Sequence, residues 1–295
     1  MALIPLLKSC NQRCLFCSAY GREDKFTLAG INKFIDGEAA RGAGSVTLSG
    51  GETTFFPRLP GVVARARAKG LRVELQTNGL TSAYPENAAR LASLGVDLFN
   101  VNFPSHVEAV NDRLTGTSGT LGPRIAGVRN LLAAGARVRL THLVTGLNYK
   151  ALPEFVRFVR RELPGISYIQ FSYVKILGLA EKNAWLAPGY AQAAPWLVKA
   201  LEACRRGRIE AMVDHIPPCW LGRFAPLSVD YIKLAGAGDL SAALAEKKKL
   251  PACARCALGD RCLGPRADHA RLFGRAAVRP VLKKPRRAKP GAARR

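Results

Sequence analysis

Cys10, Cys14 and Cys17 stand close together near the amino terminus, in the run CNQRCLFC. Their C-x3-C-x2-C spacing supplies three thiolates from one short loop. This suits a [4Fe-4S] cube that needs a ligand on three irons and keeps the fourth iron open. A structural zinc site usually has four protein ligands, and no fourth Cys or His lies within reach in sequence. The spacing therefore predicts an iron-sulfur cluster whose open iron is a place for chemistry.

A second cysteine group lies toward the carboxyl end. Cys219 stands in HIPPCWLG, and Cys253, Cys256 and Cys262 form C-x2-C-x5-C in CARCALGDRC. Four thiolates suit a closed [4Fe-4S] cluster or a structural zinc site. We expect a cluster here, with zinc and unliganded cysteines as the alternatives. Cys204, in EACRRGR, is expected to be an ordinary thiol.

The amino-terminal segment indicates in which compartment the cysteines lie, and so whether their thiols stay reduced. The apolar start MALIPLL is too short for the hydrophobic region of a secretory signal peptide and lacks a basic flank. No run approaches 18 apolar residues, so no membrane span is expected. We therefore expect a cytoplasmic protein with reduced cysteines.

Short β-rich segments alternate with helical ones along the first part of the chain, and the order predicts how the cysteines are positioned. The expected strands are 3–7, 45–49, 72–77, 97–102, 137–144 and 167–172. The expected helices are 28–42, 58–70, 83–95, 121–135 and 150–162. Several helices end at a glycine, the usual C-cap residue. Six such units in series predict a parallel sheet with right-handed crossovers.

The alternation within each strand predicts the shape of that sheet. In RVELQTN, Val73 and Leu75 share one face, whereas Glu74 and Gln76 share the other. A closed eight-stranded barrel fills its interior with branched aliphatic side chains. We therefore expect an open six-stranded partial barrel, with its apolar face on the helices and its polar face lining a wet interior. Active sites of such barrels lie at the carboxyl ends of the strands, where CNQRCLFC follows the first strand.

The cysteine run resembles a known signature. C-x3-C-x2-C with an aromatic residue before the last cysteine, here Phe16, resembles the radical S-adenosylmethionine (SAM) superfamily. The resemblance implies a partial (β/α)6 TIM barrel that binds a [4Fe-4S] cluster and SAM. It also implies reductive cleavage of SAM to a 5'-deoxyadenosyl radical, which abstracts hydrogen from a substrate, and a reductant such as flavodoxin or ferredoxin.

The same resemblance extends to the loop after the second expected strand. SGGET contains Gly50, Gly51 and Glu52 and is similar to the family's GGEP motif, although Thr53 replaces the proline. Glycines at a strand end allow backbone to approach a ligand closely. A following acid can accept hydrogen bonds from an ammonium group. The resemblance places these three residues beside the SAM amino group.

Residues at the ends of later strands are further candidates. Asn78, in QTNG, and Asn102 stand where the family carries polar residues near SAM. The family's G-x-I-x-G-x-x-E pattern is not visible in THLVTGLNYK, so Val144 and Asn148 are assigned by position alone. His106 is expected over the barrel mouth, with either a substrate role or simple packing. No catalytic residue is assigned.

The carboxyl cysteines resemble the twitch and SPASM extensions of radical SAM enzymes, which carry auxiliary clusters. Arg266 stands where the longer motif has its last cysteine, which favours a twitch-like lobe with a single cluster. The expected organisation is a barrel core at 1–185, a metal-binding extension at 186–278 and a basic disordered tail at 279–295. Relatives with such lobes often modify peptides or proteins, so a peptide is the leading substrate class.

The formal net charge of +24 is partly concentrated at one end. Residues 279–295 hold eight Lys or Arg and no acid. Such a segment can bind nucleic acid by counterion release, but no aromatic residue interleaves it to stack on bases. The basic charge makes RNA a secondary substrate candidate, and a small cofactor precursor is the other. The alternative that is not an enzyme is a non-catalytic iron-sulfur or zinc protein that binds nucleic acid.

Overall fold

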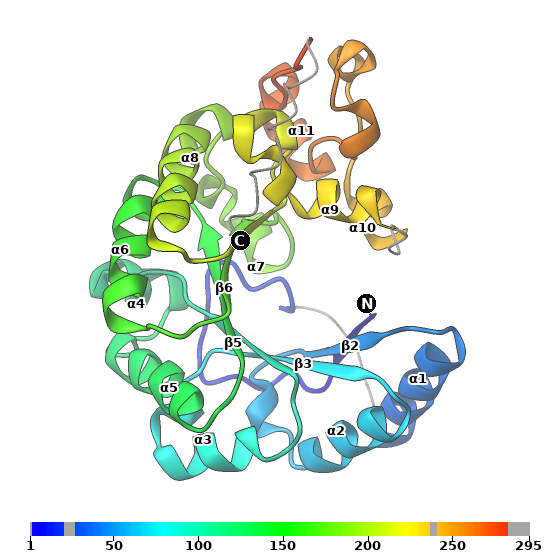
Figure 1. Cartoon of the computed structure of the whole chain (residues 1–295), viewed down its shortest axis with the longest axis vertical. Helices are drawn as coiled ribbons and strands as arrows, with labels where there is room; N and C mark the ends of the chain where they lie inside the picture. Colours follow the sequence, from blue (N-terminus) through cyan, green and yellow to red (C-terminus); the bar gives the residue numbers. More distant parts are fainter. Residues whose placement is uncertain (1, 21–26, 237–240, 283–295) are drawn as a thin grey trace, which may run out of the picture.

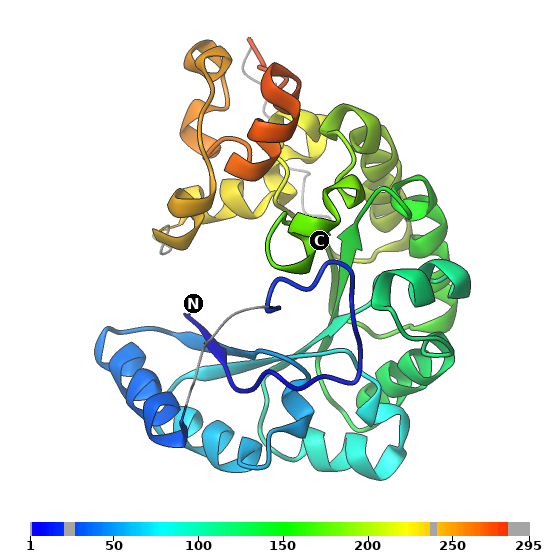
Figure 2. The same cartoon turned by 180° about the vertical axis from the view of Figure 1, so that it is seen from behind.

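The computed structural model describes residues 2–20, 27–236 and 241–282. Seven parallel strands form one sheet in chain order, from β1 to β7. Their bounds are β1 Ala2–Pro5, β2 Ser45–Ser49, β3 Arg72–Thr77, β4 Leu98–Asn102, β5 Val138–Val144, β6 Tyr168–Tyr173 and β7 Ala211–Asp214. The sheet curves as a barrel does, but β1 and β7 remain its two edges (Figures 1 and 2). The expected open partial barrel is therefore confirmed.

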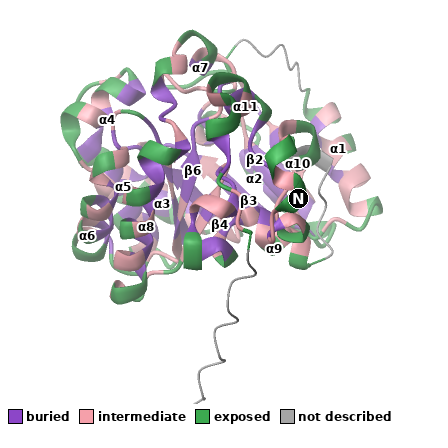
Figure 3. Cartoon of the chain, turned by 90° about the horizontal axis from the view of Figure 1, so that it is seen from above, coloured by how far each residue is buried: buried purple, intermediate pink, exposed green. Residues whose placement is uncertain are grey.

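Helices cover the outer face of the sheet (Figure 1). They are α1 Leu28–Ala40, α2 Leu59–Ala68, α3 Pro85–Ala92, α4 Glu108–Thr115, α5 Leu121–Ala133, α6 Leu152–Glu162 and α8 Tyr190–Gly207. The short helix α7, Leu179–Lys182, instead follows β6 inside the ring of helices. Figure 3 shows buried strands inside a ring of helices whose outer faces are exposed. Val73, Leu75, Phe99 and Val101 are fully buried in this layer, as their alternation predicts.

The polar faces of the strands turn to the interior and bind one another. Arg139 Nη2 donates to Glu74 Oε1 at 2.6 Å, and Asn100 Nδ2 donates to the same oxygen at 3.2 Å. Thr141 Oγ1 donates to Asn100 Oδ1 at 2.7 Å. Burial raises the pKa of Glu74, and Arg139 opposes that shift. Around Glu74, Asn100 and Arg139 the interior is therefore a buried network of cross-strand hydrogen bonds, where we expected a wet lining.

The sheet has one strand more than the sequence predicted. β7 is only four residues long, and it pairs with β6 after the long helix α8. The expected core boundary at 185 therefore falls within the layers of the barrel, which continue to Asp214. A four-residue strand gives too short an alternation to distinguish it from a loop.

A small lobe follows β7 and packs at the carboxyl end of β6 (Figures 1 and 2). It contains α9 Val229–Ala235, α10 Ser241–Glu246 and α11 Ala267–Phe273. Asp268 Oδ2 accepts the Ile176 N–H at 2.9 Å, and Arg266 pairs with Asp268 at 2.8 Å. Asp268 thus joins the lobe to the segment after β6, and Arg266, at the position where the longer motif has its last cysteine, pairs with that carboxylate. No described helix is both long and apolar enough to cross a membrane.

Candidate active site

The cysteine loop continues the strand pairing of β1. Beyond Pro5, the Leu6 N–H donates to Ser49 O at 2.8 Å. The Gly51 N–H then donates to Leu7 O at 2.7 Å, and the Glu52 N–H to Ser9 O at 2.9 Å. The chain therefore reaches Cys10 in an extended conformation, paired with the GGE segment of the SGGET motif.

The two glycines of that segment are required by the chain's own backbone. Gly50 has φ +129°, and a Cβ there would lie 2.5 Å from Leu7 O. A Cβ on Gly51 would lie 2.1 Å from Ser9 O. We expected these glycines to let the backbone approach a ligand closely. In the described residues, they instead let it approach the backbone of the segment that leads into Cys10.

Gly51→Ala is therefore expected to displace the cysteine loop. The new methyl group must push back a backbone carbonyl, and such overpacking typically costs about 1–3 kcal/mol. We expect less iron per chain after anaerobic reconstitution, together with a lower denaturation midpoint. Gly61→Ala on α2 is the matched control, because its Cβ would meet nothing within 4 Å. Equal iron content in the two variants would contradict this account of the motif.

Two further segments hold the rest of the loop. The carbonyls of Leu114 and Thr115, at the end of α4, accept the N–H groups of Leu15 and Arg13, each at 2.9 Å. After β6, the Leu179 N–H donates to Cys17 O at 3.0 Å. Phe16 packs against a small apolar cluster beside these segments. Its members are Val174, Ile176, Ala180 and Ala187. The loop is thus fastened on three sides.

The three thiols lie near one another on this loop. Burial raises the pKa of Cys14 to about 12, and the negative charges of Cys10 and Cys17 as thiolates add to the shift. Burial also raises the pKa of Cys10. A hollow of about 400 Å³ opens beside Cys10, lined also by Asn11, Arg13, Gly116 and Thr117. Because metal binding requires thiolates, loading an iron cluster at this loop would release protons.

Glu52 is almost fully buried and joins the GGE segment to the end of β3. Its Oε1 accepts the hydroxyl groups of Thr54 at 2.7 Å and Thr77 at 2.5 Å, and the Thr54 N–H at 3.2 Å. Its Oε2 accepts the Asn78 N–H at 2.7 Å. Most of the carboxylate's acceptor positions are therefore filled by the chain itself, which makes Glu52 a residue that positions Asn78.

Asn78 lies beside the first cysteine. Its Nδ2 donates to Asn11 Oδ1 at 2.6 Å and lies 3.9 Å from Cys10 Sγ. Asn102 ends β4, one residue beyond the Thr77–Val101 pair, and is therefore level with Asn78 on the neighbouring strand. The structure brings Asn78 to the thiols and places Asn102 one strand further along the sheet.

The remaining sequence candidates lie in packed surroundings. Asn148 is buried and caps its own loop, because its Nδ2 donates to Pro104 O and Leu143 O. Val144 is fully buried in the core. The His106 ring packs on Phe158 of α6, with ring centroids 5.5 Å apart, which matches the packing alternative for this residue. Its local sequence gave no sign of the aromatic side chains on α6.

Sequence reasoning missed Arg124, whose side chain is fully buried beneath the cysteine loop. The buried face of α5 carries Leu121, Arg124, Val128 and Leu131. An arginine in an apolar stripe at helical spacing is a signal that could have identified it, because an arginine is almost never fully buried without a partner.

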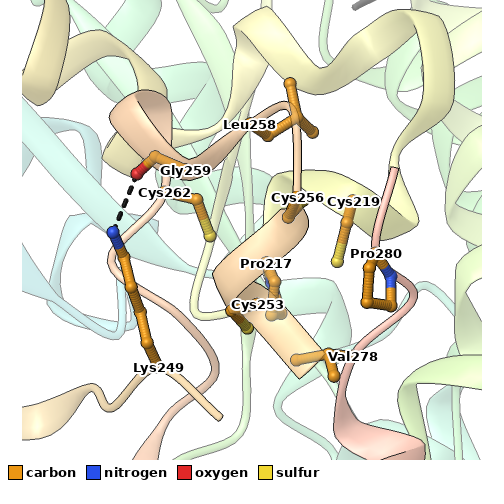
Figure 4. A pocket seen from close by; sticks show the side chains of 10 residues that line it. All are labelled: Pro217, Cys219, Lys249, Cys253, Cys256, Leu258, Gly259, Cys262, Val278 and Pro280. Atoms are coloured by element: carbon orange, nitrogen blue, oxygen red, sulfur yellow. Dashed lines mark hydrogen bonds between the residues drawn. The ribbon is translucent and has the colours of Figure 1, made fainter. Parts of the chain in front are cut away.

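The carboxyl cysteines line a single hollow, shown in Figure 4 with Cys219, Cys253, Cys256 and Cys262 around it. Three of their sulfurs accept backbone N–H groups. These come from Gly264 to Cys262 at 3.2 Å, from Val281 to Cys256 at 3.4 Å and from Arg279 to Cys219 at 3.5 Å. Burial raises the pKa of Cys219 to about 11 and that of Cys262 to about 12. The donors of this hollow suit thiolate sulfur, because N–H groups stabilise its negative charge.

No group of three or more His, Cys, Asp or Glu in the described part of the chain is arranged to hold a metal ion. The thiols of the carboxyl hollow, and likewise those of the cysteine loop, therefore lie near one another without converging on the position of a single ion. A four-iron cube takes each thiolate on a different iron, so its ligands need not converge as closely as those of one ion. Cys204 lies apart, buried on α8.

The first part of the expected tail belongs to the lobe. Arg279 and Val281 donate to the cysteine sulfurs, so the ordered lobe continues through residue 282. The rest of the expected tail, 283–295, lies outside the described residues.

Comparison with known proteins identifies a family and a fold. The profile of the Radical SAM superfamily matches residues 4–159. Fe-coproporphyrin III synthase of Methanosarcina barkeri is 28% identical over 173 residues, which are 57% of this chain and 43% of that protein. Mycofactocin maturase MftC of Mycobacterium tuberculosis is 31% identical over 160 residues, 53% of this chain and 40% of the maturase. The matches thus span about half the length of these curated relatives, or less.

Solved structures show the same fold. Streptococcus suis SuiB bound to the precursor peptide SuiA aligns with a TM-score of 0.59 at 15% identity, over 73% of this chain and 48% of SuiB. Native anSMEcpe with bound AdoMet and the Kp18Cys peptide also gives 0.59, at 12% identity, over 72% of this chain and 62% of that protein.

Proposed function

The chain belongs to the radical SAM superfamily, and from that premise we propose that it holds a [4Fe-4S] cluster on Cys10, Cys14 and Cys17 and cleaves SAM reductively. When bound, the cluster and SAM supply a one-electron cleavage that yields methionine and a 5'-deoxyadenosyl radical able to abstract hydrogen. The observation that carries the proposal is the loop itself. Three thiols stand on one segment that is hydrogen-bonded on three sides at the carboxyl edge of an open parallel sheet.

The chain's own residues have distinct roles in this proposal. Gly50 and Gly51 let the loop approach the end of β2, and Glu52 orients Asn78. We assign SAM contacts to Asn78 and Asn102, which are level on neighbouring strands, and a packing role to Phe16. The hollow beside Cys10 gives a small molecule access to that thiol.

The test is anaerobic reconstitution of the full chain with iron and sulfide, followed by SAM and dithionite. Formation of 5'-deoxyadenosine, measured by chromatography with mass detection, supports the proposal. A chain that carries the N-terminal cluster, binds no SAM and releases no 5'-deoxyadenosine would be a non-catalytic iron-sulfur protein. The physiological electron donor would be a flavodoxin or ferredoxin.

We propose that the carboxyl hollow holds a second [4Fe-4S] cluster on Cys219, Cys253, Cys256 and Cys262. Support comes from the shared hollow and from the N–H groups aimed at three of the sulfurs. Zinc is the alternative, because four thiolates suit either group. In this proposal residues 215–282 form a metal-binding lobe that faces the carboxyl end of the barrel.

For the substrate we propose a peptide or protein. Two structural relatives are described with bound peptides, and one curated relative is a maturase. A small cofactor precursor is the second candidate, because two curated relatives are named Fe-coproporphyrin III synthase and pre-heme d1 synthase. Deuterium transfer from labelled candidates into 5'-deoxyadenosine distinguishes them, since only the true substrate donates hydrogen.

A further inference from the structure

Arg124 lies beneath the cysteine loop in surroundings that do not neutralise its charge. The side chain is fully buried on α5, with its guanidinium 6.0 Å from the Phe103 ring centroid. Its Nε donates to Asn78 O at 3.1 Å, its Nη2 to Gln12 Oε1 at 3.1 Å, and its Nη1 to Asn111 Oδ1. All three acceptors are neutral. Among the described residues, Arg124 makes no salt bridge.

A buried cation without an anion beside it is expensive, because the protein interior replaces water poorly around a charge. Burial lowers the pKa of Arg124 to about 10, which leaves it protonated at neutral pH. The strongest opposing influence is the charge of Cys14 as a thiolate, ahead of Asp112 and Glu52. The partner that best explains this cation is therefore a ligand of the proposed cluster.

The same side chain joins the two parts of the site. Gln12 lies between Cys10 and Cys14, and Asn78 lies at the end of β3 beside Cys10. One planar guanidinium thus holds the cysteine loop and the β3 end in a fixed relation, with donor directions that a lysine does not have.

We propose that Arg124 is the fixed countercharge of the N-terminal cluster and positions the cysteine loop against Asn78. This inference rests on the proposed function. Three thiolates make the cluster site negative, and each added electron makes it more so. A cation held nearby therefore favours the reduced state, because net charge and hydrogen bonding set the potential of such clusters.

The test compares variants of the full chain by EPR-monitored redox titration, following the signal that SAM perturbs. Arg124→Met removes the charge, and we expect a lower midpoint potential than in the wild-type protein. Arg124→Met should also bind the cluster about tenfold to hundredfold less tightly in a chelator challenge. This is the usual loss of affinity when a residue that supports the metal ligands is removed. Arg124→Lys keeps the charge and is expected to restore most of the potential.

Asn111→Asp provides a second variant that leaves the arginine in place. It sets a carboxylate against Nη1 and should lower the potential by neutralising the charge, whether or not Arg124→Met folds. Asn87→Asp is the matched control, because Asn87 contacts Arg90 on α3, away from the cysteine loop. Wild-type potentials in Asn111→Asp, or in a folded Arg124→Met, would overturn the proposal. A wild-type chain that binds no cluster would instead refute the proposed function, before any variant is compared.

Discussion

Replacing Cys14 with alanine is expected to abolish SAM cleavage while leaving the barrel folded. Cys14 is the central thiol of the three, and in the proposed function it ligates one iron of the cluster. Loss of a residue that hydrogen-bonds to a metal ligand already lowers metal affinity or activity by about tenfold to hundredfold. Loss of the ligand itself should exceed that, and we expect at least a hundredfold fall in 5'-deoxyadenosine formation.

The measurement pairs the rate of 5'-deoxyadenosine formation with iron and sulfide content per chain. Cys204→Ala is the matched control, because Cys204 is a buried thiol on α8 that lies apart from both cysteine groups. That variant should lose some stability and keep its SAM cleavage. If Cys14→Ala cleaved SAM at the wild-type rate, the cysteine loop would not be the cluster site.

The features that the sequence predicted well are local. Alternation over five to seven residues located β2 through β6, and the spacing of the N-terminal cysteines needs no partner segment to be recognised. The confirmed open barrel follows from these strands, because their polar faces could not fill a closed aliphatic interior.

The features that it missed depend on distant segments. Gly51 is needed because Ser9 O lies where its Cβ would be, and Gln12 meets Arg124 across 112 positions of sequence. Neither contact leaves a periodic signal. Glu52 illustrates the same limit, because its acid suggested a ligand contact until Thr77 and Asn78 were seen to donate to it.

Cys256→Ala is expected to remove the second metal group and keep SAM cleavage within a few-fold of wild type. The carboxyl hollow draws its thiols from the lobe after β7, whereas the N-terminal loop is held by β2, α4 and the segment after β6. The two sites therefore share no ligand, and metal loss at one should leave the other loaded. A four-iron cube at each site predicts roughly eight irons in the wild-type chain and roughly four in the variant.

Metal analysis of Cys256→Ala also decides what the lobe contains. Loss of zinc with unchanged iron would overturn the proposal of a second cluster, because four thiolates suit either metal group. If iron falls and substrate turnover is lost while SAM cleavage is retained, the second cluster acts in a step that follows radical formation. Cys256 accepts the Val281 N–H, so the variant also loosens residues 279–282. Cys219→Ala, which loses the Arg279 contact instead, should give the same metal content if the thiols act as one ligand set.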